Sequence, residues 1–249
     1  MGSLLIRCSS LGKLMTQPKS KADREDGILS ETTKGYLDEL IFSVKYGREK
    51  EFSNKYTEKG LEVEQDGIHL LNTVKTKLYR KNQTRFENGL STGMPDIVTA
   101  DSIIDIKSCF DFSTFLKKSE IEKDYFWQLC GYCSLTGKKK GAIAYTLNNT
   151  PFHLILNEFT SRYYKNGMVD LSDEDKARIA HNHIYYDKNG YWEECRFMHF
   201  PTSNLEFIPI EENKRLRFYE VEFSDANFEA LDLAIERAIN YINEKIHTL

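Results

Sequence analysis

Apolar and polar positions follow the period of a β-strand in several segments of the chain. Residues 93–98 and 102–108 are short apolar runs separated by a turn at 99–101, which predicts two strands joined as a hairpin. Residues 142–147 and 215–223 predict two further strands. Because a helical segment separates the second and third of these four strands, we expect those two to pair in parallel within one sheet.

Helical periodicity and capping residues mark four more segments. Ser30 is placed to cap a helix that reaches about Lys45, and Ser224 begins a long amphipathic helix. Another helix is expected to end at Gly137, because glycine readily adopts the left-handed conformation that ends helices. Ser172 opens a fourth helix. Helices on both sides of the strands predict an α/β (α+β) fold with a central mixed β-sheet.

Three segments give weaker patterns. Residues 4–8 predict a short strand. Residues 86–90 predict another strand of the sheet, with the bend either at Asn88-Gly89 or at 91–93. Residues 148–215 are less regular, and we interpret them as an insertion before the last strand and helix.

Composition narrows the class of protein. Of the 249 residues, 29% are charged and 40% hydrophobic, which is ordinary for a globular protein. No apolar run is long enough to cross a membrane, and five scattered cysteines favour the reducing cytoplasm. The net charge of −4 does not mark a nucleic-acid binder, although an acidic site and acidic outer faces can mask one basic channel.

The predicted hairpin carries the strongest chemical signal. Asp105 and Lys107 are two residues apart in a strand and therefore share a face, while Asp96 enters the neighbouring strand directly after Pro95. Mg²⁺ typically uses one or two carboxylates, together with waters and substrate phosphates. A lysine beside such an ion can orient a water or stabilise charge on a phosphate. The hairpin thus has the outline of a site for metal-assisted phosphodiester hydrolysis.

Two helical segments add polar side chains to this site. Glu64 shares a predicted helical face with Leu61 and Ile68, and a carboxylate on an apolar stripe is costly unless it is paired or bound to a metal. The alternative is a glutamate at a helix start, favoured by the helix dipole. Gln128 and Tyr132 are four apart and share a face of the helix after the hairpin.

These motifs together resemble a known nuclease superfamily. Pro95-Asp96 followed by Asp105-x-Lys107 resembles the PD-(D/E)xK signature, with Asp105 where many members carry Glu. The Gly-x-x-x-Glu spacing that ends at Glu64 resembles the phage lambda exonuclease group, also called YqaJ-like recombinases. The aromatic-Gln-x-x-Gly-Tyr helix resembles that of RecB-type nucleases. The resemblance covers about residues 7–147.

The resemblance implies a fold and a set of roles. It implies one nuclease domain over residues 1–249, with a restriction-endonuclease-like catalytic core at about 50–150. Glu64, Asp96, Asp105 and the carbonyl of Ile106 would hold one or two Mg²⁺ ions, with Mn²⁺ expected to substitute. Lys107 would position or deprotonate the attacking water. Gln128 and Tyr132 would orient Lys107, a water or the DNA backbone.

DNA contact is expected from basic and polar residues near these motifs. A basic run lies between the Glu64 helix and the hairpin, and its alternative role is a solvated face. Arg7, Ser10 and Lys13 are candidates for a position near a DNA end. The full expected set of DNA-binding residues is Lys75, Lys77, Arg80, Lys81, Arg85, Ser108 and Tyr132.

By the same resemblance, we expect a metal-dependent exonuclease that degrades linear double-stranded DNA from its ends, 5′ to 3′, in phage-type recombination. Expected partners are a single-strand annealing protein and further copies of the chain in a ring-shaped trimer, in the cytoplasm of a bacterial host. One alternative is a structure- or sequence-selective endonuclease on the same core. Another is a DNA-binding or assembly protein without catalysis.

Other constellations are disfavoured. Cys130 and Cys133 form a C-x-x-C inside the predicted Gln128 helix, where buried thiols are a better interpretation than iron–sulfur ligands. A zinc site from His181, His183, Cys195 and His199 matches no common ligand spacing. No Walker-type phosphate loop is present, so no ATP-driven motor is expected.

Overall fold

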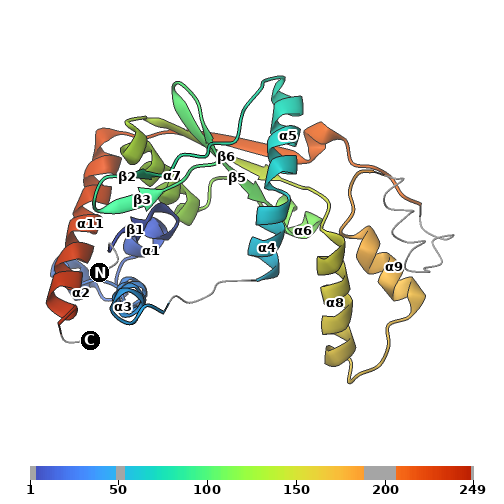
Figure 1. The fold of residues 1–249 in the computed structure, drawn as a ribbon, viewed down its shortest axis with the longest axis horizontal. Coiled ribbons are helices and arrows are strands. Elements are labelled where there is room, and N and C mark those ends of the chain that lie inside the picture. Colours follow the sequence, from blue (N-terminus) through green and yellow to red (C-terminus); the bar gives the residue numbers. More distant parts are fainter. Residues whose placement is uncertain (1–3, 49–53, 188–205, 248–249) are drawn as a thin grey trace.

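The computed structural model describes residues 4–48, 54–187 and 206–247. Its strands form two sheets, which together with the surrounding helices make a mixed α/β fold (Figure 1). The helices in chain order are η1 (Cys8–Ser10), α1 (Leu11–Leu14), α2 (Lys21–Glu25), α3 (Glu31–Tyr46), α4 (Lys55–Glu62), α5 (Glu64–Lys75), α6 (Phe112–Leu116), α7 (Lys123–Thr136), α8 (Phe152–Lys165), α9 (Asp173–His181), η2 (Glu212–Lys214) and α11 (Asp225–Lys245).

The larger sheet has the order β4-β5-β6-β7, from β4 (Ile97–Val98), β5 (Ser102–Ser108), β6 (Lys140–Thr146) and β7 (Leu216–Glu222). The first two strands form the expected antiparallel hairpin, in which Thr99 donates its N–H to the carbonyl of Ser102 at 2.9 Å. The parallel pairing of β5 with β6 across α7 is also confirmed. The last strand pairs antiparallel with β6.

The smaller sheet has the order β1-β3-β2, from β1 (Ile6–Arg7), β2 (Phe86–Glu87) and β3 (Ser91–Gly93). The strand expected at 86–90 therefore forms, but it belongs to this separate sheet rather than to the main one. Its bend is at Asn88-Gly89, where Gly89 has a φ of 83°. A segment of three residues after β3 leads directly into β4, so the two sheets meet at the hairpin.

Each face of the larger sheet is covered by different helices. On one face Ile103, Ile143 and Tyr145 pack against α7 and α11 in the main hydrophobic core. On the other face, Ile104 and Ile106 pack against Ile68 and Leu71 of α5. Since side chains alternate along a strand, Asp105 and Lys107 of β5 must lie on the α7 side.

The capping residues behave as expected. Ser30 Oγ accepts the N–H of Thr33 at 3.1 Å, and Ser172 Oγ accepts that of Asp175 at 3.1 Å. The helix through Gln128 ends at Gly137, which has a φ of 68°. None of the helices among the described residues is both long and apolar enough to cross a membrane.

Two expectations about helices were wrong. Residues 148–215 were expected to be less regular apart from the helix opened by Ser172, yet 152–165 also form a helix, α8, which packs against α9 in a small core of its own. The helical face expected to run from Leu61 through Glu64 is interrupted, because α4 ends at Glu62 and α5 begins at Glu64. Leu61 is consequently 76% exposed, while Ile68 is buried.

Candidate active site

Asp96 is held in the hairpin by a hydrogen bond from a backbone N–H that is not paired with another strand. Strand β4 pairs with β5 only at Ile103 and Ile104, so the N–H of Ile106 lies beyond the ladder on that side. Asp96 Oδ2 accepts this N–H at 2.6 Å. Pro95, just before it, cannot donate to a ladder, which is why the pairing ends here. The sequence Pro-Asp therefore ends the ladder and places a carboxylate against the next strand.

Asp105 and Lys107 lie side by side on β5. Asp105 is 2% exposed, and its Oδ2 atom forms an ion pair with Lys107 Nζ at 2.7 Å. Lys107 Nζ donates to Gln128 Oε1 at 3.1 Å, and Gln128 Nε2 donates to the Tyr132 hydroxyl at 2.8 Å. The ring of Tyr125 lies 4.5 Å from the same ammonium. Lys107 is thus contacted by Asp105 of β5 and by Gln128 and Tyr125 of α7, and Gln128 is in turn held by Tyr132.

Glu64 reaches the site from the first position of α5. One of its oxygens, Oε2, lies 2.9 Å from Lys81 Nζ. The other, Oε1, is buried and has no hydrogen-bond partner among the described residues. A glutamate that opens a helix is favoured by the helix dipole. Glu64 therefore both begins helix α5 and contributes a carboxylate to the candidate site.

The three carboxylates are close enough for their negative charges to repel one another. Burial, the charge of Asp105 and, more weakly, that of Glu64 raise the pKa of Asp96 to about 8, against the lowering effect of the Ile106 N–H and Lys107. Burial lowers the pKa of Lys107, but the neighbouring Asp105 outweighs it and leaves that pKa above its usual value. Asp96 and Asp105 thus share the Lys107 ammonium while Glu64 pairs with Lys81, and a further cation would relieve the repulsion among the three acids.

The donor set fits a hard divalent cation. Among the described residues Glu64 Oε1 is a buried carboxylate oxygen without a hydrogen-bond partner, whereas Asp105 Oδ2 has the Lys107 ammonium at 2.7 Å. Buried carboxylate oxygens are costly when they are left unpartnered, and carboxylates are the ligands that Mg²⁺ and Mn²⁺ prefer. This observation, rather than the motif alone, supports a metal at these residues.

The residues expected to contact DNA are dispersed around the site. Arg85 and Arg7 line a groove of about 570 Å³ that is also lined by Tyr132. Lys81 pairs with Glu64, as described above. Lys75 instead stacks on the ring of Phe218, with its Nζ 3.9 Å from the ring centroid.

Three other expected contacts lie elsewhere. Ser108 lies on the α5 face of β5, where its hydroxyl is 3.2 Å from the Thr146 hydroxyl, so it does not share a face with Lys107. Lys77 borders a different groove, which is also lined by residues of β5, β6 and β7. Arg80 is exposed on the loop that follows α5.

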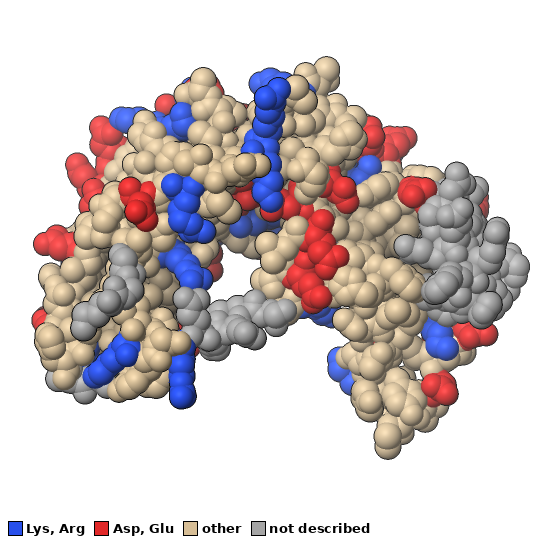
Figure 2. All heavy atoms as spheres, in the orientation of Figure 1, with Lys and Arg blue, Asp and Glu red and all other residues tan. Residues whose placement is uncertain are grey.

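Several basic side chains border a hollow on the face that Figure 2 shows. Figure 2 shows a hollow between the part that contains α3 and the part that contains α4 and α8. Lysines and arginines gather over the loop after α5 and along the α1 and α3 side of the hollow, while acidic side chains gather over α4 (Figures 1 and 2). A chain with a net charge of −4 thus presents a localised basic surface.

Several polar groups were missed by sequence reasoning. Lys59 is 0% exposed, and its Nζ donates to the carbonyl of Phe110 at 2.8 Å and to Thr150 Oγ1 at 3.0 Å. Burial lowers its pKa to about 7. His183 is also buried, with Nδ1 3.2 Å from Thr150 Oγ1. A lysine next to a glycine gives no local sign of burial, because its partners Phe110 and Thr150 come from the segments that follow β5 and β6.

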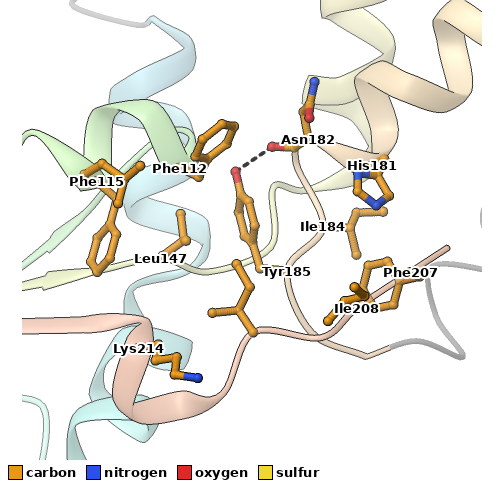
Figure 3. Close-up of a pocket in the computed structure, with 12 residues that line it drawn as sticks. Phe112, Phe115, Leu147, His181, Asn182, Ile184, Tyr185, Phe207, Ile208 and Lys214 are labelled. Carbon is orange, nitrogen blue, oxygen red and sulfur yellow. Dashed lines mark hydrogen bonds between the residues drawn. The ribbon is translucent and has the colours of Figure 1, made fainter. Parts of the chain in front are cut away.

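The cysteines and histidines that were weighed as iron–sulfur or zinc ligands are placed as follows. Cys130 and Cys133 are buried, and burial raises the pKa of both thiols to about 12. Cys195 and His199 lie outside the described residues. His181 lines an apolar cavity of about 480 Å³ together with Phe112 and other apolar side chains (Figure 3). None of the carboxylates described above lines this cavity.

Comparison with known proteins identifies the fold. No protein-family model and no curated protein matches the sequence. The crystal structure of a phage related exonuclease from Haemophilus somnus 129PT matches 99% of this chain and 97% of its own, at a TM-score of 0.72 and 25% identity. An alkaline exonuclease, LHK-Exo from Laribacter hongkongensis, matches 99% of this chain and 91% of its own at a TM-score of 0.61 and 11% identity. Its complex with dAMP matches equally well, with a TM-score of 0.61 and 12% identity. The chain therefore shares its fold, over nearly its whole length, with phage-related and alkaline exonucleases.

Proposed function

We propose that this chain is a metal-dependent DNA exonuclease that degrades linear double-stranded DNA from its ends, 5′ to 3′. The observation that carries the proposal is the convergence of Glu64, Asp96 and Asp105 beside Lys107, within a fold shared with exonucleases. The unpartnered buried Oε1 of Glu64 and the mutual repulsion of the carboxylates support a bound cation. The basic surface beside the hollow supports a polyanionic substrate.

Glu64, Asp96, Asp105 and the carbonyl of Ile106 would hold one or two Mg²⁺ ions, with Mn²⁺ as a substitute. When bound, such an ion polarises a phosphate oxygen and makes a bound water more acidic. The chain's own contribution begins with Asp96, whose bond to the Ile106 N–H fixes one carboxylate before any ligand arrives. This preorganisation avoids a reorganisation cost during reaction.

Lys107 supplies a positive charge at the position where a phosphate would lie. In the metal-free chain the neighbouring Asp105 holds the pKa of Lys107 above its usual value, so the ammonium is placed to stabilise charge on a phosphate. With a metal bound, Lys107 would position or deprotonate the attacking water. Gln128 accepts one ammonium hydrogen and is itself held by Tyr132, so the lysine side chain is restricted. The groove of Arg7, Arg85 and Tyr132 begins at this point and would take part of the DNA backbone.

The test uses linear double-stranded DNA labelled at the 5′ end, with Mg²⁺ or with EDTA. We expect early release of labelled mononucleotide from the wild-type chain with Mg²⁺, and a loss of at least about 100-fold in Asp105→Ala. Asp170→Ala, an exposed aspartate between α8 and α9, serves as the matched control and should cleave normally. Release of internal fragments, or cleavage of supercoiled plasmid, would identify an endonuclease instead. Metal-independent binding with no cleavage of any DNA form, in Mn²⁺ as well, would leave a DNA-binding protein.

The same proposal includes a biological setting of phage-type recombination in a bacterial cytoplasm. There the exposed single strand passes to an annealing protein, and three copies of the chain form a ring. Analytical ultracentrifugation with and without DNA tests the assembly, since a monomer at all concentrations would contradict it.

A further inference from the structure

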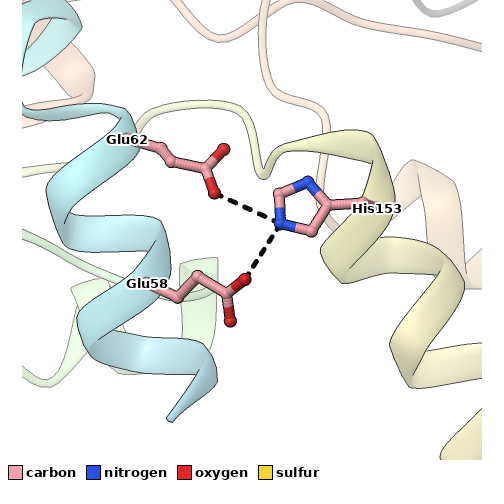
Figure 4. A group of neighbouring side chains, drawn as sticks. All are labelled: Glu58, Glu62 and His153. Carbon is pink, nitrogen blue, oxygen red and sulfur yellow. Dashed lines mark hydrogen bonds and ion pairs between the residues drawn. The ribbon is translucent and has the colours of Figure 1, made fainter. Parts of the chain in front are cut away.

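Three polar side chains meet where α4 contacts α8, outside the site described above. Glu58 and Glu62 lie one turn apart on α4, and His153 is the second residue of α8 (Figure 4). His153 Nε2 is 3.2 Å from Glu58 Oε1 and 3.2 Å from Glu62 Oε1. All three ligand atoms lie within 4.8 Å of one another. Two helices separated by some ninety residues of sequence thus direct their donors to one point.

The hydrogen bond between His153 Nε2 and Glu58 Oε1, at 3.2 Å, accounts for only one of the two contacts. One imidazole nitrogen carries at most one hydrogen, so His153 can make a good bond to only one of the two carboxylates. Charge-assisted bonds of this kind are about 2.7–2.9 Å long, and both contacts here are longer. The glutamates are also like charges at i and i+4, which repel each other on a helix. Three electron-pair donors therefore face one another with too few hydrogens between them.

The distances match a metal chelate. In a tetrahedral site with metal–ligand distances of about 2.0–2.2 Å, neighbouring ligand atoms lie about 3.3–3.6 Å apart. The two 3.2 Å contacts are close to that edge length. A nitrogen with two carboxylate oxygens favours Zn²⁺ over Mg²⁺ or Ca²⁺, which take oxygen ligands. The three side chains are each about half exposed, so an ion can enter from solvent.

We propose that Glu58, Glu62 and His153 form a second metal site, for Zn²⁺, that joins α4 to α8. Three protein ligands leave the fourth position to water. The ion pair between Lys55 and Glu158, at 3.1 Å, already links the same two helices. The metal would complete this link and fix the small α8–α9 core to the rest of the fold.

The position of the site gives it two effects. Helix α4 is followed after one residue by α5, whose first residue is Glu64, so a fixed α4 restrains that carboxylate. The two glutamates also lie on α4, where acidic side chains gather beside the hollow (Figure 2). A bound Zn²⁺ cancels their charge and makes that wall less repulsive to a nucleic acid.

The test measures zinc bound per chain by equilibrium dialysis in excess Mg²⁺, on full-length protein carrying Asp105→Ala to weaken the first metal site. We expect one zinc per chain with this single substitution. Adding His153→Ala should weaken that zinc at least about 100-fold, since even the loss of an outer-shell partner costs 10–100-fold. Adding His69→Ala instead removes an exposed histidine of α5 outside the cluster and should leave the zinc bound.

Co²⁺ gives a second readout that does not depend on activity. In the His69→Ala chain Co²⁺ should show the strong visible absorption of a tetrahedral site, and this absorption should be absent from the His153→Ala chain. Circular dichroism confirms that both variants are folded. Equal zinc binding by the two double variants, or no zinc in either, would overturn the proposal.

Discussion

Gly67 of α5 lies so close to β5 that a methyl group added at this position would stand 2.7 Å from Ile106 Cγ2. The contact is made three residues after Glu64, on the same helix. It therefore sets the distance between the helix that carries one acid and the strand that carries another. A glycine at this point is a requirement of packing, not of backbone conformation.

Gly67→Ala should push α5 away from β5. We expect a loss of about 1–3 kcal/mol in the free energy of unfolding, which is typical of overpacking, together with lower nuclease activity because Glu64 moves. Gly60→Ala is the matched control, since it is also helical and has no heavy atom within 4 Å of the added carbon. That variant should gain up to about 1 kcal/mol and keep its activity. Urea denaturation and the cleavage assay measure both, and equal behaviour of the two variants would contradict the account.

Tyr132→Phe removes the hydroxyl that holds Gln128. Gln128 Nε2 then lacks its partner in a buried place, and Lys107 is less firmly positioned. We expect a loss of about 1–3 kcal/mol in stability and a fall of about tenfold in kcat with little change in KM. Tyr241→Phe removes a comparable hydrogen bond, to Asp38 at 2.9 Å between α11 and α3, and should reduce stability without reducing kcat. A normal kcat in Tyr132→Phe would show that Gln128 does not position the lysine.

Asp96 should make the metal-free protein less stable as pH rises. Its pKa is raised to about 8 in the folded chain and is about 4 when unfolded, so the folded state binds more protons between these values. Stability in EDTA should therefore fall from about pH 4 to pH 8, by at most about 1.4 kcal/mol per pH unit. Asp96→Asn should reduce that slope. Urea denaturation across this range measures it, and an unchanged slope in the variant would assign the effect to other groups.

Lys59 has the opposite effect at higher pH. Its pKa is lowered to about 7 by burial, and an unfolded lysine has a pKa near 10.4, so the unfolded state binds more protons between these values. Stability should rise from about pH 7 to about pH 10. Lys59→Met, which keeps the apolar stem and removes the amine, should flatten this rise. Thermal denaturation at several pH values checks it, with a persistent rise as the contradictory result.

Local patterns predicted most of the fold. The hairpin at 97–108 and the caps at Ser30 and Ser172 depend on residues close together in sequence, and all three are present. The two mixed sheets were anticipated as one, because pairing of β1 with β3 involves residues more than eighty positions apart. A strand pattern states which residues are extended, but not which sheet they join.

Other features depend on contacts that carry no local signal. The break at Val63 follows from packing, since Val63 is buried between two helices that are each acceptable alone. Helix α8 buries Ile155 and Phe159 against α9, a partner that periodicity does not reveal. The approach of His153 to Glu58 is of the same kind. The acids and lysine of the candidate site were within reach of prediction because the hairpin and α7 place them within short stretches of sequence.

The position of β7 and α11 bears on the order in which the protein is made. Every residue proposed to bind metal, and Lys107 with the residues that hold it, lies between 64 and 132, yet the core beneath β5 and β6 also needs Phe223, Leu231 and Ile235 from β7 onward. On the ribosome, a growing chain that has already exposed all its acids and Lys107 still lacks this part of its core. The strand that carries Asp105 and Lys107 is therefore fully packed only once β7 and α11 have joined the fold, so the candidate site is completed late in synthesis although its residues are made early.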